Sequence, residues 1–209
     1  MSQSGVIAEI EAASGRHVSR ETFKRLETFV KILKASASEQ NLIASSTLDQ
    51  VWGRHILDSA QLVRLEPRAH STWLDVGSGA GLPGLVVAIL VDGPVTLVEP
   101  RRLRADFLRN AVETLGLSNR VRVEQAKVER ISGTFDMITA RAVAPLSRLL
   151  EISAHLSTKK TVWALPKGRS ALTELAEAQR AWQGAFHVEQ SVTDEDSYIV
   201  VASGVGKKP

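Results

Sequence analysis

Two spacings of apolar residues divide the chain into an N-terminal helical part and a longer part in which strands and helices alternate. Ser19 can cap a helix whose apolar residues recur at helical spacing: Phe23, Leu26, Val30, Leu33 and Ala37. Ser46 and Asp49 form a capping-box-like start for a second helix. Its apolar face contains Leu48, Val51, Trp52, His55, Ser59 and Leu62. We also expect a short helix before Ser19.

From residue 72 onward, short apolar runs alternate with amphipathic stretches. The predicted strands are residues 72–76, 95–99, 121–124, 135–139 and 161–165. The predicted helices are residues 82–91, 101–115, 146–154 and 171–182. This order predicts an α/β fold with a parallel sheet covered on both faces. Residues 186–191 and 198–202 are strands joined by the turn-rich TDEDS, so we expect the sheet to end in an antiparallel hairpin with a mixed edge.

Length and composition fit one soluble domain with an extension. A chain of 209 residues with 44% hydrophobic residues is long enough for one packed core. We therefore expect residues 1–70 to form an N-terminal helical extension packed on the core, and residues 71–209 to form the main domain. The net charge of +3 permits a nucleic-acid partner without arguing for one.

Two absences in the sequence narrow the protein class. Glu9 and Glu11 interrupt the apolar stretch near the N-terminus, which argues against a signal peptide, and the longest apolar run, residues 85–91, is too short to span a bilayer. We therefore expect a cytoplasmic protein without a membrane partner. The absence of cysteine excludes disulfides, cysteine-ligated zinc and a thiolate nucleophile.

The glycine-rich segment LDVGSGAGLPG follows the first predicted strand and is the strongest functional signal. Ligands of open α/β sheets bind at the carboxyl ends of the strands, so Gly77, directly after the strand, should face the ligand. A dinucleotide fingerprint counted from Gly77 requires its third glycine at residue 82, where the sequence has Leu82. A fingerprint counted from Gly79 starts two residues too late.

The charge beside this segment distinguishes two cofactors. A dinucleotide places its pyrophosphate over the helix N-terminus, and the carboxylate of Asp75 would repel it. S-adenosylmethionine has no phosphate and carries an ammonium and a sulfonium, so Asp75 could hold its amino group directly or through water. Glu99 ends the second strand, where an acid accepts hydrogen bonds from ribose hydroxyls. The sequence favours S-adenosylmethionine bound over Gly77, Gly79 and Gly81, with the adenine near Val128 and Glu129 after the third strand.

The methyl acceptor can be narrowed by elimination. Methylation of pyrimidine carbon-5 requires a cysteine, and methylation of base amino groups usually uses an N/D/S-P-P-aromatic tetrapeptide after strand four, where this chain has ARAVAP. An endocyclic nitrogen with a free lone pair, such as guanine N7, needs no general base. This fits a site that offers Arg141, whose guanidinium could bind a guanine edge, a phosphate or the methionine carboxylate of the donor. A surface arginine without a role is the alternative.

Several motifs together resemble the bacterial 16S ribosomal RNA (guanine-N7) methyltransferase G family. The motifs are NL at Asn41-Leu42, RHILDS at 54–59, DVGSGAGLPG at 75–84, ARA around Arg141 and LPKG at 165–168. The resemblance implies a class I methyltransferase with a seven-stranded mixed sheet whose last strand is antiparallel. It also implies methyl transfer from S-adenosylmethionine to N7 of a guanine in 16S rRNA near the decoding region. The family's donor-binding positions correspond here to Gly77, Leu82, Val128, Glu129 and Arg141. Ala140 departs from the family, which commonly has a serine at this position.

RHILDS and the basic residues allow more than one interpretation. Arg54 and Asp58 could form an ordinary i,i+4 surface pair, and His55 lies on the apolar stripe, so we expect a structural His55 and an Arg54 that contacts RNA or the site. Basic residues follow strand two and surround strand five: Arg101, Arg102, Arg104 and Arg109, then Lys159, Lys160, Lys167 and Arg169. The candidate RNA-binding residues are Arg54, Arg101, Arg102, Lys167 and Arg169.

Three functions remain open from the sequence. The first is an rRNA guanine-N7 methyltransferase that acts as a monomer on 16S rRNA or the small ribosomal subunit, with Arg141 as the positioning residue. The second is a methyltransferase that acts on a small molecule, and the third is a non-catalytic ribosome- or nucleotide-binding protein with the same fold.

Overall fold

Helices form the N-terminal part of the molecule, as predicted. The computed structural model describes residues 2–40, 42–44 and 48–209, with the backbone alone for residues 37–40. α1 (Gln3–Ser14) is followed by α2 (Arg20–Gln40), and the hydroxyl of Ser19 accepts a hydrogen bond from the Thr22 amide at 3.1 Å. The predicted capping box at Ser46 and the Ala37 side chain lie outside the described residues. The second predicted helix consists of the wider π-type turn η2 (Trp52–Leu57), then α3 (Asp58–Ala60) and η3 (Gln61–Leu65).

The alternating part contains all the predicted strands and helices. The strands are β1 (Trp73–Val76), β2 (Val95–Val98), β3 (Val121–Glu124), β4 (Met137–Ala140), β5 (Val162–Lys167), β6 (Trp182–Gln190) and β7 (Tyr198–Lys207). The helices are α4 (Gly84–Leu90), α5 (Arg102–Thr114), the short turn η4 (Val128–Arg130), α6 (Leu146–Ser153) with η5 (Ala154–Leu156), and α7 (Ala171–Ala181). β6 begins four residues before its predicted start, because its mostly exposed positions as an edge strand give little apolar pattern.

The sheet has the strand order β3-β2-β1-β4-β5-β7-β6. β1 to β5 are parallel, and β7 pairs antiparallel with both β5 and β6, so the predicted terminal hairpin and mixed edge are confirmed. The order reverses between β1 and β4, whose carboxyl ends therefore flank the switch point at which open α/β sheets bind ligands. None of the described helices combines the length and apolar character needed to cross a membrane.

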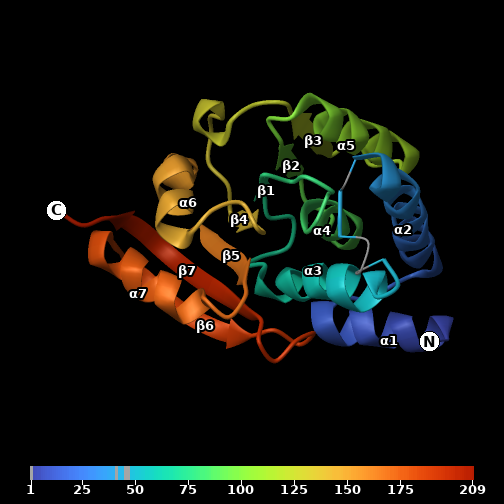
Figure 1. Cartoon of the computed structure of the whole chain (residues 1–209), viewed down its shortest axis with the longest axis horizontal. Coiled ribbons are helices and arrows are strands. Elements are labelled where there is room, and N and C mark those ends of the chain that lie inside the picture. The colour runs from blue at the N-terminus through green and yellow to red at the C-terminus, as the bar shows by residue number, and fades with distance from the viewer. Residues whose placement is uncertain (1, 41, 45–47) are drawn as a thin grey trace.

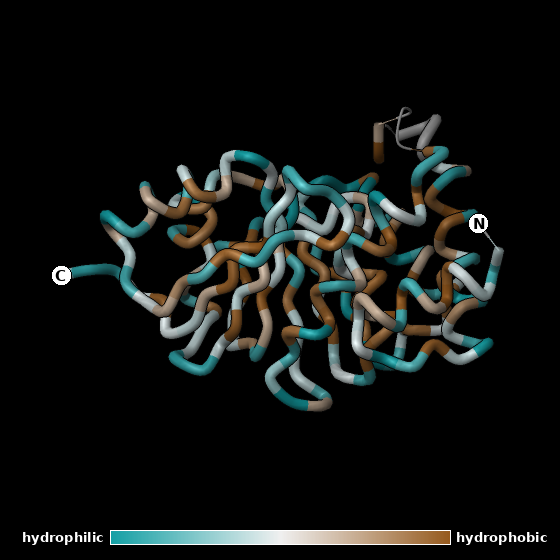
Figure 2. Tube along the Cα trace, turned by 90° about the horizontal axis from the view of Figure 1, so that it is seen from below, coloured by the Kyte–Doolittle hydropathy of each residue, from teal (hydrophilic) through white to brown (hydrophobic). Residues whose placement is uncertain are grey.

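Alternate residues along each strand pack into two separate cores. Figure 1 shows α6 and α7 on one side of the strands and α2, α4 and α5 on the other. Trp73 of β1 packs with α1, α2, α4 and α5 on one face, whereas Leu74 packs with α6 and α7 on the other. Ile199 and Val200 of β7 show the same alternation. The strands in the middle of the molecule are accordingly the most apolar, and the turns at the edges are polar (Figure 2). Each β1 side chain thus has a fixed face, and Asp75 faces α4.

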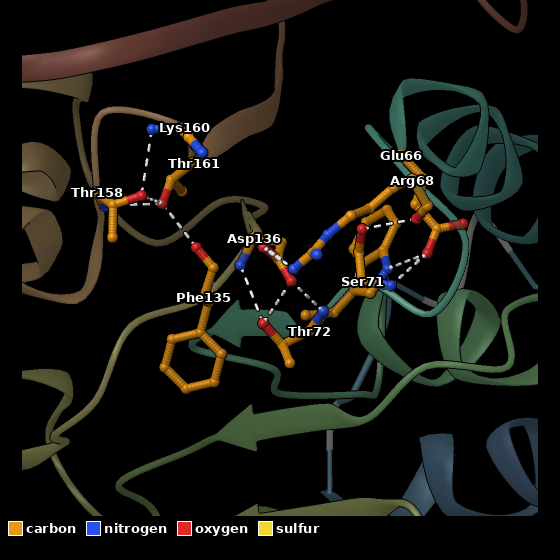
Figure 3. A network of polar contacts seen from close by, with 10 residues as sticks. Glu66, Arg68, Ser71, Thr72, Phe135, Asp136, Thr158, Lys160 and Thr161 are labelled. Atoms are coloured by element: carbon orange, nitrogen blue, oxygen red, sulfur yellow. Dashed lines mark hydrogen bonds and ion pairs between the residues drawn. The ribbon is translucent and has the colours of Figure 1, made fainter.

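Hydrogen bonds fix the amino ends of the central strands, on the edge opposite the candidate site (Figure 3). The carboxylate of Asp136 accepts bonds from the amide and hydroxyl of Thr72 at 2.9 and 3.0 Å and from Arg68 at 2.8 Å. Thr161 donates to the carbonyl of Phe135 at 2.6 Å. These contacts join the starts of β1, β4 and β5. The amide of Phe135 bonds to the carbonyl of Leu156 outside the sheet, so β4 begins at Met137 rather than at the predicted residue 135.

Candidate active site

The segment after β1 forms a tight turn at the carboxyl edge of the sheet. Gly77, Gly79 and Gly81 have φ values of +68°, +51° and +80°, a backbone conformation that residues other than glycine rarely adopt. A Cβ on Gly77 would lie 2.6 Å from Cγ2 of Val143, and a Cβ on Gly81 would lie 2.5 Å from Leu85. Gly77 and Gly81 are therefore required both by backbone conformation and by close packing, whereas Gly79 is required by conformation alone.

Asp75 lies beneath this turn and is fully buried. Its Oδ2 accepts the Gly84 amide at the start of α4 at 3.2 Å, and its Oδ1 accepts the Thr139 hydroxyl of β4 at 3.0 Å. Burial raises the pKa of Asp75 from its usual 3.8 to about 6, although these bonds favour the carboxylate. The helix N-terminus that would hold a pyrophosphate already holds this carboxylate, which counts against a dinucleotide. A direct contact between Asp75 and a donor ammonium stays a prediction.

Glu99 follows β2 and joins the glycine turn to α5. Its Oε2 accepts the Gly79 amide at 3.0 Å, and its Oε1 accepts the Arg101 amide at 2.8 Å. A carboxylate oxygen can accept more than one hydrogen bond, so these contacts leave acceptor capacity for a ribose. The side chain of Arg104 also lies here, because its Nη1 is 3.7 Å from where a Cβ on Gly79 would be.

The remaining predicted donor-binding residues lie on neighbouring turns. Leu82 is buried within the glycine turn. Val128 is buried in the same core as Val76 of β1 and Val98 of β2, while Glu129 is exposed beside it. An apolar side chain next to an exposed carboxylate is the arrangement expected beside an adenine ring, and this assignment stays a prediction.

Arg141 directly follows β4, and its partners come from the N-terminal helices. Its Nη1 donates to Oδ2 of Asp58 at 3.1 Å, and its Nη2 lies 3.5 Å from Nδ1 of His55. Burial and the nearby guanidinium lower the pKa of His55 to about 4. The imidazole is therefore neutral near pH 7, and Nδ1 must be the acceptor because arginine has only donors. The i,i+4 pair suggested for Arg54 and Asp58 is not formed: Arg54 instead pairs with Asp194 at 3.3 Å.

Arg141 lines a cavity of about 520 Å³ between the carboxyl ends of β4 and β5. Much of its remaining wall is formed by the loop of residues 142–145, together with Pro166, Lys167 and Tyr198. The carboxylates of Asp58 and Glu174 also line this cavity. Each carboxylate is ion-paired, Asp58 with Arg141 and Glu174 with Lys167, so neither acts as an unpaired base.

Lys167 holds the loop between β4 and α6 in place. Its ammonium donates to the carbonyl of Ala144 at 2.8 Å and pairs with Glu174 at 2.8 Å, and Glu174 also accepts the Leu146 amide at 2.9 Å. Burial alone would raise the pKa of Glu174, but Lys167, together with hydrogen bonds from Ser170 and the Leu146 amide, holds that pKa below its usual value. Ala142 in this loop has a φ of +56°. The RNA contact proposed for Lys167 stays a prediction; in the structure its side chain is 10% exposed and its ammonium already binds Ala144 and Glu174.

The other predicted RNA-binding residues are exposed at or near the carboxyl edge. Arg101 and Arg102 begin α5 beside Glu99, while Arg54 and Arg169 pair with acids of the β6–β7 turn, Asp194 and Asp196. Lys159 and Lys160 precede β5 and Lys167 ends it, so the expected basic cluster near this strand is divided between opposite edges of the sheet. Sequence reasoning missed Thr139 and Glu174, whose roles depend on contacts between distant segments.

Comparisons with known proteins place the chain among methyltransferases. A sequence model described as rRNA small subunit methyltransferase G matches residues 22–197. The ribosomal RNA small subunit methyltransferase G of Sphingopyxis alaskensis is 52% identical over 188 residues, which cover 89% of this chain and 80% of that relative. The protein of the same name from Novosphingobium aromaticivorans is 47% identical over 213 residues, covering 98% of this chain and 92% of that relative.

Solved structures share the fold at low identity. TrmN from Thermus thermophilus aligns with a TM-score of 0.57 and 21% identity, covering 75% of this chain and 50% of that chain. A ribosomal protein L11 methylase from Lactobacillus delbrueckii subsp. bulgaricus aligns with a TM-score of 0.55 and 15% identity, covering 75% of this chain and 79% of that chain. Together with the strand order, these likenesses confirm the predicted class I methyltransferase fold.

Proposed function

Because the chain belongs to the rRNA small subunit methyltransferase G family, we propose that it transfers a methyl group from S-adenosylmethionine to N7 of a guanine in 16S rRNA near the decoding region. The observation that carries the choice of donor is the glycine turn over a buried carboxylate at the N-terminus of α4. This arrangement suits a cationic ligand and disfavours a pyrophosphate. S-adenosylmethionine supplies a methyl group on a sulfonium.

The proposed donor site consists of residues from four turns at the carboxyl edge. It comprises Asp75, Gly77, Gly79, Gly81, Leu82, Glu99, Val128, Glu129 and Arg141. In this assignment Glu99 binds the ribose, Val128 and Glu129 flank the adenine, and Arg141 aligns the acceptor or the donor carboxylate. The N7 lone pair loses no proton on methylation, so alignment rather than a general base supplies the catalysis. The ion-paired state of Asp58 and Glu174 supports this assignment.

The proposed function is tested with methyl-labelled donor and 30S subunits that lack the modification. We expect wild-type protein to place the label in 16S rRNA as 7-methylguanosine. Label found only on small metabolites would support a small-molecule methyltransferase. Absence of donor binding in calorimetry would support a non-catalytic binding protein. Naked 16S rRNA in a parallel reaction distinguishes the free RNA from the assembled subunit as substrate, and size-exclusion chromatography with light scattering tests the proposed monomer.

Arg101 and Arg102 are proposed to contact RNA phosphates beside the donor site. We expect the double variant Arg101→Gln/Arg102→Gln to bind 16S rRNA more weakly and to reduce the salt slope of log K by roughly 2, because each phosphate contact contributes about 1. Filter binding between 50 and 200 mM salt measures this slope. The matched control, Lys159→Gln/Lys160→Gln, removes the same charge at the opposite edge and should keep the wild-type slope. Equal slopes for the two variants would contradict this surface.

The charge of Asp75 should make donor affinity depend on pH. With its pKa raised to about 6, Asp75 takes up a proton as the pH falls below 6 and no longer attracts the ammonium. We expect the affinity for S-adenosylmethionine to fall about tenfold between pH 7 and pH 5, measured by calorimetry. His55, with a pKa of about 4, stays largely neutral in this window. Asp75→Asn should bind weakly and without this pH dependence; a steep dependence in that variant would exclude Asp75 as its source.

A further inference from the structure

Asp58 is the point at which three distant segments of the chain meet. It lies in α3, within the N-terminal helices, and its Oδ2 accepts from Arg141 at the end of β4. Its Oδ1 accepts from Gln61 at 3.0 Å and from Thr193 of the β6–β7 turn at 3.2 Å. The two oxygens of one carboxylate therefore bind two separate groups of donors.

The Asp58–Arg141 pair is largely shielded from solvent. The side chains of Asp58 and Arg141 are 15% and 20% exposed, whereas Arg54 and Asp194 of the neighbouring pair are 54% and 36% exposed. A shielded hydrogen bond between charges fixes geometry far better than an exposed one, because water and side-chain motion compete less. Asp58 thus restrains the orientation of the guanidinium at the wall of the cavity.

His55, one helical turn before Asp58, also contacts the guanidinium of Arg141. The neutral imidazole offers a lone pair to Nη2 without adding a second charge. Asp58 and His55 together use one N–H of each terminal nitrogen. An arginine has five N–H donors, so three remain for the donor carboxylate, the guanine edge or a phosphate.

We propose that Asp58 is a positioning residue, which acts through Arg141 by holding its guanidinium toward the cavity between β4 and β5. The N-terminal helices are then part of the active site, and His55 and Asp58 of the RHILDS motif have a role beyond packing. The inference rests on the proposed function, since it needs a methylation reaction in which Arg141 participates.

A merely structural role for Asp58 makes a different prediction, because Oδ1 alone could hold the β6–β7 turn. A double-mutant cycle between Asp58→Asn and Arg141→Ala separates the two roles. We expect Asp58→Asn to lower kcat/KM for rRNA methylation about 10- to 100-fold when Arg141 is present, as for loss of a hydrogen bond to a charged group. In the Arg141→Ala background, the same substitution should change kcat/KM by less than about twofold.

Two further variants keep the test decisive. Thr193→Val removes a bond to Oδ1 and leaves the Oδ2 contact, so its kcat/KM should stay within about twofold of wild type. Asp58→Glu keeps the charge but moves it by one methylene, and we expect a lower kcat with little change in thermal unfolding or in KM for RNA. This variant provides the readout if Asp58→Asn does not fold.

The outcomes divide clearly. A loss for Asp58→Asn that disappears in the Arg141→Ala background supports positioning, whereas an equal loss in both backgrounds would overturn it. Wild-type kcat in Asp58→Glu, or a loss in Thr193→Val as large as in Asp58→Asn, would also overturn it. A wild-type protein that methylates neither naked 16S rRNA nor 30S subunits would contradict the proposed function itself and remove the basis of this inference.

Discussion

Replacing Arg141 with alanine is expected to lower kcat/KM for rRNA methylation by at least about 100-fold while the protein remains folded. The reason is geometric, because in-line methyl transfer depends on alignment and Arg141 is a shielded cation at the cavity wall with donors left for a ligand. Removal of the guanidinium also leaves Asp58 without its charged partner, so the free energy of unfolding should fall by about 1–3 kcal/mol. Steady-state kinetics with labelled donor and urea unfolding of the same preparation measure both quantities.

Two control substitutions separate the geometry of Arg141 from its charge. Arg141→Lys keeps a cation but loses the forked donors, and we expect it to recover only part of the activity. Arg68→Ala removes an arginine whose ion pair with Asp136 lies at the opposite edge of the sheet, and it should retain wild-type kcat/KM. Wild-type turnover in Arg141→Ala would remove this residue from the active site and leave Asp58 with a purely structural role.

The sheet could be predicted from sequence because each strand shows its burial directly. β1, for example, has an apolar side chain on each face of the sheet, Trp73 on one and Leu74 on the other, as expected for parallel strands covered by helices on both sides. The edge strand β6 has no such pattern, because most of its side chains contact solvent, and its start was therefore predicted four residues late. The change from helical to strand spacing likewise located the start of the alternating part at residue 72.

The partners of the site residues could not be predicted in the same way. Local spacing paired Asp58 with Arg54, four residues away, but the structure pairs Asp58 with Arg141 and Arg54 with Asp194. These contacts join segments that are 83 and 140 residues apart in the sequence, and apolar periodicity contains no information on such pairs. The burial of Lys167 against Glu174 could not be predicted for the same reason, since it arises only when α7 packs near β5.

The glycine turn could be predicted from the sequence in part, whereas its contacts with a distant segment could not. Its letters predicted a ligand site, and the position of Gly77 after β1 predicted which glycine faces the ligand. The contact of Gly77 with Val143 came only from the structure, because Val143 belongs to the loop after β4. This contact shows that the glycine turn and the loop after Arg141 pack directly against each other, so a substitution in one is expected to shift the other.

Gly77→Ala is accordingly expected to weaken S-adenosylmethionine binding by about 100-fold. A methyl group at this position would lie 2.6 Å from Cγ2 of Val143, so the Val143 side chain or the loop that carries it must shift. In addition, the φ of +68° costs a non-glycine residue about 1–2 kcal/mol. Titration calorimetry with the donor measures affinity, and thermal unfolding without donor measures the combined cost of the backbone strain and the contact with Val143.

Gly116→Ala provides the matched control for backbone strain. Gly116 has a φ of +66°, nearly the value of Gly77, but a Cβ there would meet no atom within 4 Å, and the residue lies beyond the end of α5 near the amino edge of the sheet. Both variants should lose similar stability from strain, whereas only Gly77→Ala should lose donor affinity. If Gly116→Ala weakened donor binding equally, the loss would reflect general destabilisation. If Gly77→Ala bound the donor as wild type does, the donor would have to bind away from the turn after β1.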